Sequence, residues 1–143
     1  MKSYNETLQQ LLTFGLEISQ IKDIDLLLEK ILSEARSFTG CDAGTIYVKE
    51  GGWLFARYSQ NDTVHSQLAS HRKSVYTNIT IPVDNSSIAG YVAATGSRLN
   101  IPDVYQLDGS APYSFNRSFD ALTNYRTISQ LVFPLTSMRG DTV

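Results

Sequence analysis

The hydrophobic pattern of this chain changes from a helical to an extended repeat near Gly40. Before that point, apolar residues recur with the spacing of amphipathic helices, in the stretches YNETLQQLLTFGLEIS and IDLLLEKILSEARSFTG. Asn5 is the expected N-cap of the first helix and Asp25 that of the second, since short polar side chains accept hydrogen bonds from the free N–H groups of a helix start. Gly40 is well placed to end the second helix.

Each predicted helix carries an apolar stripe. In the first helix the stripe consists of Tyr4, Leu8, Leu11, Gly15 and Ile18, widened by Leu12 and Leu16. In the second helix the residues expected to face inward are Leu27, Leu28, Ile31, Leu32, Ala35 and Phe38. The first stripe is more apolar than a lone helix at the edge of a domain needs. Two explanations stay open: the second helix and the sheet bury it, or residues 1–22 form a dimerisation helix.

After Gly40 the apolar residues alternate, first in the stretch AGTIYVKEGGWLFARYS. Gly51 and Gly52 divide this stretch into two halves, which predicts an antiparallel hairpin. TNITIPV predicts a third strand, with Pro82 at a sheet edge or a strand end.

Shorter elements are predicted for the rest of the chain. They are a short helix around Val64 and Leu68, a helix IAGYVAATG capped by Ser86 or Ser87 and closed by Gly96, a strand RLNIP, a turn capped by Asp103, a short helix from about Phe119 and a last strand from Ile128 to Leu135. This order of helices and strands predicts an α+β fold, in which helices cover an antiparallel sheet.

The bulk properties fit one folded domain. The chain has 143 residues, of which 42% are hydrophobic and 18% charged, and one cysteine, which excludes an internal disulfide and fits a reducing compartment. A net charge of −2 gives no basic field for nucleic acid. No apolar run is long enough to span a membrane, and the N-terminus lacks the apolar core of a signal peptide. We therefore expect a cytoplasmic domain that binds neither nucleic acid nor membrane.

Known catalytic motifs are missing from the sequence. It contains no GxGxxG, Walker or GxSxG motif, so neither a phosphate-binding loop nor a serine nucleophile is indicated. His65 and His71 are separated by six positions, which puts them on different faces of any helix, and no acidic cluster joins them. Cys41 is expected to be a small buried apolar residue. We expect no catalytic residue, no metal and no cofactor.

Two blocks, SSIAGYVAATGSRLNIPDVYQL and FDALTNYRTISQLVFPL, resemble the GAF domain family, in particular GAF domains of cyclic-nucleotide phosphodiesterases and of bacterial signalling proteins with HD-GYP phosphodiesterase outputs. AGTIYV resembles the first core strand of the family, so the resemblance runs from about Asp25 to Leu135. It implies a central antiparallel sheet, with N-terminal helices on one face and short helices that roof a small-molecule pocket on the other. It also implies that residues 23–143 are a GAF core that lacks a final strand and helix.

The resemblance assigns seven residues to that pocket: Thr45, Ile88, Ala89, Asn116, Asp120, Thr123 and Thr127. Asp120, Thr123 and Thr127 match positions that contact the purine or the phosphate in cyclic-nucleotide-binding members, so cAMP or cGMP is the implied ligand. From the residues alone, Asp120 and Thr123 share a helix face, and the start of the Ile88 helix offers free N–H groups to an anion. Asn116 departs from the pattern, because some members have an aromatic residue there.

Structural explanations of the same residues stay open. Asp120 can cap the short helix, and Thr123 and Thr127 can hydrogen-bond to the backbone. For Arg126 we favour a surface or sheet-edge ion pair over a ligand contact.

The resemblance implies a regulatory module of a signal-transduction protein, which binds a small ligand, forms a homodimer, or does both, and so controls a C-terminal output domain. One alternative is a dimerisation module without a ligand. Another is an enzyme, because one GAF branch reduces free methionine sulfoxide. That chemistry needs a nucleophilic and a resolving cysteine, and the chain has only Cys41, which disfavours the enzyme.

Overall fold

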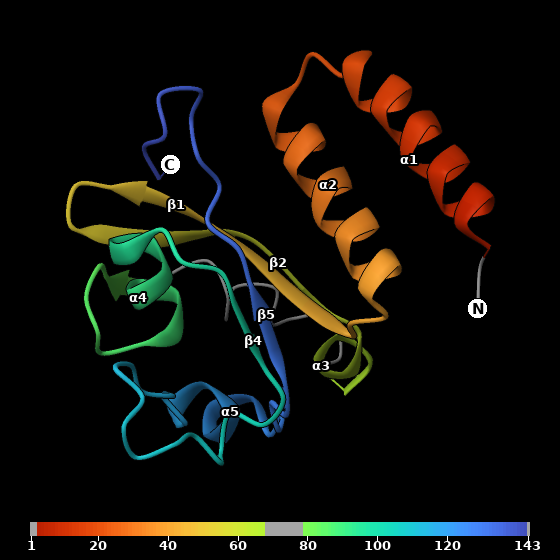
Figure 1. The fold of residues 1–143 in the computed structure, drawn as a ribbon. Helices are drawn as coiled ribbons and strands as arrows, with labels where there is room; N and C mark the ends of the chain where they lie inside the picture. The colour runs from red at the N-terminus through yellow and green to blue at the C-terminus, as the bar shows by residue number, and fades with distance from the viewer. Residues whose placement is uncertain (1–2, 68–78, 143) are drawn as a thin grey trace.

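The computed structural model describes residues 3–67 and 79–142 of the chain. The elements, in chain order, are α1 (Tyr4–Ser19), α2 (Ile24–Thr39), β1 (Ala43–Glu50), β2 (Trp53–Asn61), α3 (Asp62–Gln67), β3 (Thr80–Pro82), α4 (Ile88–Thr95), β4 (Leu99–Ile101), α5 (Ser118–Thr123) and β5 (Gln130–Val132) (Figure 1). This mixture of helices and antiparallel strands confirms the predicted α+β class.

Both long helices begin with an N-cap that lies two residues before the predicted one. In α1 the hydroxyl of Ser3 accepts a hydrogen bond from the backbone N–H of Glu6, whose carboxylate accepts one from the N–H of Ser3. In α2 the carboxylate of Asp23 accepts from two backbone N–H groups. Asn5 and Asp25 were wrong as N-caps because these earlier side chains already satisfy the free N–H groups of the first turn.

Helix α2 packs on the β1–β2 hairpin (Figure 1). Leu32 is buried, and Gly44 on β1 permits the close approach, since a Cβ there would lie 2.8 Å from Leu32 Cδ1. Leu27, Leu28 and Ile31 are half-buried, in agreement with the predicted inward stripe.

Ala35 and Phe38 were wrongly assigned to the inward stripe of α2, because both are exposed. Phe38 lines a cavity between α1 and α2 and is 40% exposed there. The left-handed backbone of Gly40, with φ 67°, ends α2 as predicted.

The strands form two antiparallel ladders. The first has the order β1-β2-β3, and the turn at Gly51 and Gly52 joins β1 to β2. Strand β3 lies at the edge of this ladder, and it ends at Pro82, as its sequence predicts. The second ladder pairs β4 with β5, with Leu99 opposite Val132.

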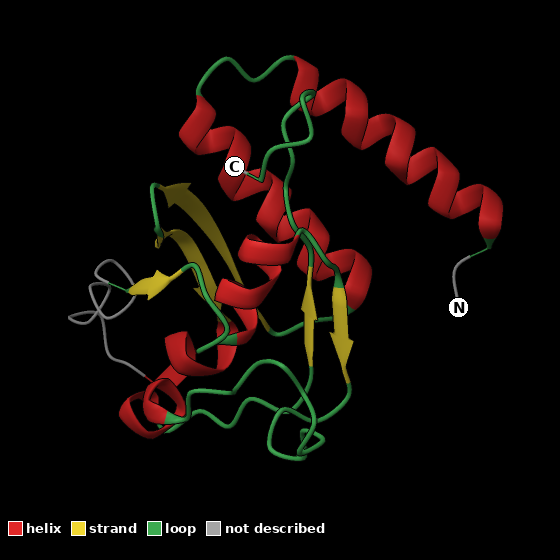
Figure 2. Ribbon diagram, turned by 60° about the vertical axis from the view of Figure 1, so that its left-hand side comes forward, coloured by secondary structure: helices red, strands yellow, loops and turns green. Residues whose placement is uncertain are grey.

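The core lies where α4 meets the β4–β5 ladder and the loops that follow β4. Its buried centre consists of Ile88, Ile101 and Val104. Leu99, Tyr105, Leu107, Tyr113, Phe115 and Val132 pack around this centre. Ser87, one of the two predicted caps, starts α4 by accepting a hydrogen bond from Gly90 N. Figure 2 shows that α1 lies at the rim of the molecule, on the far side of α2 from the strands.

Helix α3 confirms part of a prediction. Val64 is buried there, with 1% of its surface exposed, whereas Leu68 lies outside the described residues. His71 and the side chain of His65 also lie outside them. Over residues 3–67 and 79–142, every helix is too short or too polar to cross a membrane.

Candidate functional site

The segment that contains α5 is held together by short-range hydrogen bonds. The side-chain oxygen of Asn116 accepts from both the backbone N–H and the hydroxyl of Ser118 just before the helix. The hydroxyl of Thr123 donates to the carbonyl of Phe119 one turn earlier, at 2.9 Å. Asn124, with a left-handed φ of 53°, then ends the helix. Asn116 and Thr123 therefore stabilise the local backbone in this structure.

Asp120 points away from this local network and joins two loops. Only 7% of its surface is exposed, and its carboxylate accepts three hydrogen bonds. They come from the Tyr105 hydroxyl at 2.8 Å, from Thr127 N at 2.8 Å and from Thr127 Oγ1 at 2.7 Å. A buried carboxylate needs such partners, because an unpaired one is strongly disfavoured inside a protein. Asp120 is thus the polar link between the loop after β4 and the loop after α5, and does not cap α5.

Tyr105 contacts several side chains of this region. Its hydrogen bond to Asp120 raises the pKa of the Tyr105 hydroxyl above its ordinary value of 10.0. Phe115 packs edge-on against its ring, with 5.2 Å between the ring centroids. The guanidinium carbons of Arg117 and Arg126 lie 4.7 Å and 4.3 Å from the ring centroid of Tyr105. The ion pair expected for Arg126 was wrong, since in the described part of the chain this side chain stacks on Tyr105 and contacts no carboxylate at ion-pair distance.

The other pocket residues implied by the resemblance occupy different surroundings. Ile88 is buried in the core at the start of α4, and Ala89 beside it is half-buried. Ile88 belongs to the cluster against which Tyr105 packs, so it lies in the same part of the fold as Asp120. Thr45 lies on the exposed surface of β1, in the other ladder, with its hydroxyl 3.1 Å from that of Ser59. The structure therefore brings Asp120 and Thr127 into direct contact and leaves Thr45 with a different partner.

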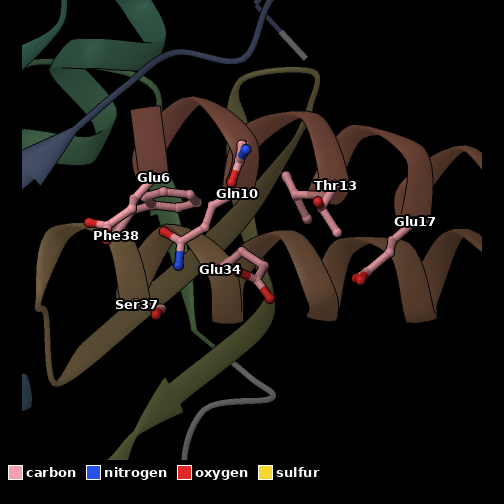
Figure 3. A pocket seen from close by; sticks show the side chains of 9 residues that line it. Glu6, Gln10, Thr13, Glu17, Glu34, Ser37 and Phe38 are labelled. Atoms are coloured by element: carbon pink, nitrogen blue, oxygen red, sulfur yellow. The ribbon is translucent and has the colours of Figure 1, made fainter. Parts of the chain in front are cut away.

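One cavity lies between α1 and α2 and has a volume of about 620 Å³ (Figure 3). Its wall is mostly polar, with Glu6, Gln10, Thr13, Glu17 and Glu34 among the lining residues. Neither this cavity nor the second one is lined by any of the seven residues of the implied pocket.

The second cavity, of about 480 Å³, lies at the C-terminal end of α2. Arg36 lines it and donates hydrogen bonds to Gln60 Oε1 at 2.8 Å and to Asp62 Oδ2 at 2.5 Å. Cys41 also lines it and is exposed, so the prediction of a buried residue was wrong. The left-handed turn at Gly40 leads the chain out of α2 at this point, and the described elements leave the thiol exposed.

Sequence reasoning did not single out Arg36, Tyr105 or Arg117. Arg36 reaches Gln60, which is 24 positions away, and Tyr105 reaches Asp120, which is 15 positions away. No local spacing signals contacts over such separations. Within residues 3–67 and 79–142, histidine, cysteine and acidic side chains form no group of three or more that could hold a metal ion.

Comparison with known proteins identifies the family. The profile of the GAF domain family matches residues 23–143. The dual 3',5'-cyclic-AMP and -GMP phosphodiesterase 11 of Drosophila melanogaster is 31% identical over 131 residues, which cover 85% of this chain and 8% of that protein. A cGMP-specific 3',5'-cyclic phosphodiesterase of Drosophila ananassae is 27% identical over 89% of this chain and 11% of its own length. The chain thus spans about a tenth of the length of these relatives.

A solved structure supports the fold. The A. aeolicus nlh2 GAF domain, in an inactive state, superimposes with a TM-score of 0.64 and 18% sequence identity. The superposition covers 92% of this chain and 74% of that one. At this identity the likeness concerns the arrangement of helices and strands and not the ligand.

Proposed function

The chain belongs to the GAF domain family, and from that premise we propose that it is a regulatory sensory module that dimerises through α1 and controls an output domain. The observation that carries this proposal is the orientation of α1. Most of its large apolar side chains are turned away from the rest of the molecule, and the side that faces α2 carries mainly polar residues besides the half-buried Phe14.

The fold leaves most of the predicted α1 stripe exposed, whereas Ile18 near its end is half-buried. Tyr4, Leu8, Leu12 and Leu16 follow one another at intervals of four, and Leu11 lies between them. The exposed fractions are 82% for Tyr4, 44% for Leu8, 50% for Leu11, 62% for Leu12 and 71% for Leu16. Residues at such spacing form one stripe along a helix. A contiguous apolar stripe of this kind marks an association surface.

The opposite face of α1 makes few contacts with α2. No residue of α1 is buried, and the space between the two helices is the polar cavity of Figure 3. Glu17 links the helices through an ion pair with Lys30 at 2.8 Å. Ion pairs at an exposed surface contribute little, about 0–1 kcal/mol. The contact with α2 is therefore small, and burial of the apolar stripe in a dimer would stabilise α1 more.

A second copy of the chain fits the apolar stripe best. A two-fold axis would bring two identical stripes together and bury the leucines of both copies at once. Each fully buried leucine contributes about 1.5–3 kcal/mol, so a few per copy can offset the cost of association.

Helix α2 provides a route for the signal. It is held to the hairpin by the hydrogen bond from Tyr58 to Asp25, at 2.5 Å, and by the Arg36 contacts to Gln60 and Asp62. A shift of the hairpin relative to the core would therefore move α2. Because α1 directly precedes α2 in the chain, such a shift would also reach the proposed dimer interface.

Sedimentation of paired variants tests dimerisation. Leu12→Glu with Leu16→Glu puts two charges into the apolar stripe, and we expect the protein to sediment as a monomer. Gln9→Glu with Thr13→Glu adds the same two charges at the same spacing to the polar face, and we expect wild-type association. If the stripe variant keeps the wild-type oligomeric state, or if wild type is monomeric throughout, α1 is not a dimer interface.

A small ligand is the second part of the proposal, and a cyclic nucleotide is the first candidate. The names of the relatives, which are phosphodiesterases of cyclic AMP and cyclic GMP, favour this ligand class. Ile88 and Ala89 start an eight-residue helix, whose first N–H groups suit a phosphate. In the structure Asp120 is already engaged with Tyr105 and Thr127, so a ligand that uses its carboxylate must replace one of these bonds.

Calorimetric titration with cAMP and cGMP tests the ligand. Ala89→Leu should block a ligand at the start of α4, whereas Ala94→Leu adds the same atoms at an exposed position on the same helix and should not. Binding that disappears in Ala89→Leu alone supports the site. If neither nucleotide binds wild type, the ligand part of the proposal fails and the dimer remains to be judged by sedimentation. The proposal assigns no catalytic step to this chain, and its single cysteine offers no partner for a two-cysteine reduction.

A further inference from the structure

We propose that Arg117 and Arg126 form an anion-binding site on the surface beside α5, and that its ligand is a carboxylate-rich segment of another protein. The two arginines flank α5 in the sequence, one just before the helix and one just after it. Both are exposed, and both place their guanidinium groups over the ring of Tyr105.

The shared ring fixes the two cations close to each other. The guanidinium carbons lie 4.7 Å and 4.3 Å from one ring centroid, so they are at most 9.0 Å apart. The ring is itself immobilised by Phe115 on its edge and by the hydrogen bond from its hydroxyl to Asp120. Part of the entropy that two long side chains lose on binding has thus been lost in the free protein.

The stacked geometry leaves the hydrogen-bonding edge of each guanidinium free. A guanidinium that contacts an aromatic ring does so with its flat face, whereas its N–H donors lie in its plane. Neither arginine has a carboxylate at ion-pair distance in the described part of the chain. Two cations held at one ring repel each other, and a segment whose carboxylates accept hydrogen bonds from each guanidinium removes that repulsion.

Arg36, which forms an ion pair with Asp62, shows the contrast. The guanidinium of Arg36 is largely buried and donates to Asp62 and Gln60, so its donors are used within the fold. Arg117 and Arg126 have equally fixed positions, but they face solvent.

The surroundings favour a protein segment as the ligand. Small molecules bind in concave sites, and neither of the cavities described above is lined by Arg117, Arg126 or Tyr105. A nucleic acid needs a broader basic field than two arginines in a chain of net charge −2. Many of the chain's own aspartates are already engaged, among them Asp25, Asp42, Asp62, Asp84, Asp103 and Asp108. We assign the site to an acidic segment of a different protein, in which successive carboxylates can reach both arginines at once.

Fluorescence anisotropy with a labelled oligoglutamate peptide at low ionic strength tests the site. We expect wild type to bind, and Arg117→Gln with Arg126→Gln to weaken binding by about tenfold, since the two lost exposed contacts together account for a factor of that order. Arg57→Gln with Arg98→Gln removes the same charge from two exposed arginines that do not stack on Tyr105, and should keep most of the affinity.

Two further variants separate geometry from charge. Arg117→Lys with Arg126→Lys keeps the net charge but removes the planar fork, and binding should weaken several-fold. Tyr105→Phe keeps the ring on which both arginines stack, and binding should persist; circular dichroism checks that each variant is folded. Wild-type binding by the lysine pair, or equal losses in the Arg57 and Arg98 variant, would show a general charge effect and overturn the proposal.

Competition identifies the class of ligand. Inorganic phosphate and a short DNA duplex are added to the bound peptide, and we expect both to displace it poorly. A duplex that binds more tightly than the peptide through the same two arginines would make the ligand a nucleic acid. Phosphate that does so would make it a small anion. Either result overturns the assignment of a protein segment.

Discussion

In the α5 segment the buried carboxylate of Asp120 meets three donors from its own chain, whereas in α1 the exposed leucines meet no cover from any described element. Both segments drew attention in the sequence for the same reason, because each concentrates one kind of side chain. The fold treats them in opposite ways. Polar groups that find all their partners inside the chain hold the structure together, and apolar groups that find none are available to a partner.

A conspicuous group of residues in a sequence can thus mark either an internal structural contact or a binding surface. Asp120, Thr123 and Thr127 are a matching set for a ligand, yet each already has a hydrogen-bond partner in the structure. Their first role is structural, and a ligand would have to compete with it. The α1 stripe has no such internal role, so its contribution to the stability of a single copy should be small. Substitutions in the two segments can therefore be ranked by their effect on that stability.

The largest effect is expected from Asp120→Ala. It leaves Thr127 N, Thr127 Oγ1 and the Tyr105 hydroxyl without their acceptor in a mostly buried place. We expect the free energy of unfolding to fall by about 3 kcal/mol, since hydrogen bonds to a charged group contribute about 1.5–3 kcal/mol each and are not additive. Urea unfolding at neutral pH measures this. A loss below about 1 kcal/mol would show that water reaches the three donors, and that Asp120 is free for a ligand.

A smaller effect is expected from Thr127→Val, which removes one of the three hydrogen bonds and keeps the shape of the side chain. The backbone N–H of Thr127 still donates to Asp120, so the expected loss is about 1 kcal/mol. Thr123→Val is the matched control, because its hydroxyl donates only to the carbonyl of Phe119 within α5. If the two variants lose the same free energy of unfolding, the hydrogen bond to Asp120 contributes no more than a local bond within α5.

Alkaline pH should loosen the same network by a further, smaller amount. The hydrogen bond to Asp120 raises the pKa of Tyr105 in the folded chain above 10.0, its ordinary value and that of the unfolded chain. A raised folded pKa means that the stability it contributes is fully present below pH 10.0 and is lost as pH rises from there through the folded value. Stability should therefore fall less steeply with pH in Tyr105→Phe than in wild type over that window. Parallel curves would show that Tyr105 does not titrate differently in the folded state.

Local sequence patterns predicted much of this fold. They could not predict contacts between residues that are far apart in the sequence. Gly51 and Gly52, Ser87 and the glycine at position 40 each act on their immediate neighbours, and their predicted turns and caps were confirmed. The N-caps of α1 and α2 were misplaced because two suitable side chains lie within two residues of each other, and the choice depends on which N–H groups they reach.

The candidate site was only partly accessible from the sequence. The pairing of Asp120 with Thr127 follows from their closeness in the chain, but the role of Tyr105 depends on how the loop after β4 folds back onto α5. Arg126 was expected in an ion pair from its charge alone, since nothing in its neighbourhood reveals the distant ring. Cys41 was expected to be buried because cysteines usually are. It is exposed because it follows the left-handed turn that ends α2.

The smallest effect on a single copy is expected from Leu12→Gln with Leu16→Gln. These leucines are 62% and 71% exposed, so the uncharged, similarly long glutamines forfeit little buried area. Surface substitutions of this kind usually change stability by less than about 0.5 kcal/mol, and glutamine is as good a helix former as leucine. Urea unfolding should be done at a protein concentration where wild type sediments as a monomer, because a dimer would add its own contribution to the stability of wild type. At higher concentration the midpoint of wild type should rise and that of the variant should not. A large loss in the dilute monomer would instead mean that the apolar stripe packs on its own chain, and the contrast between α1 and the α5 segment would disappear.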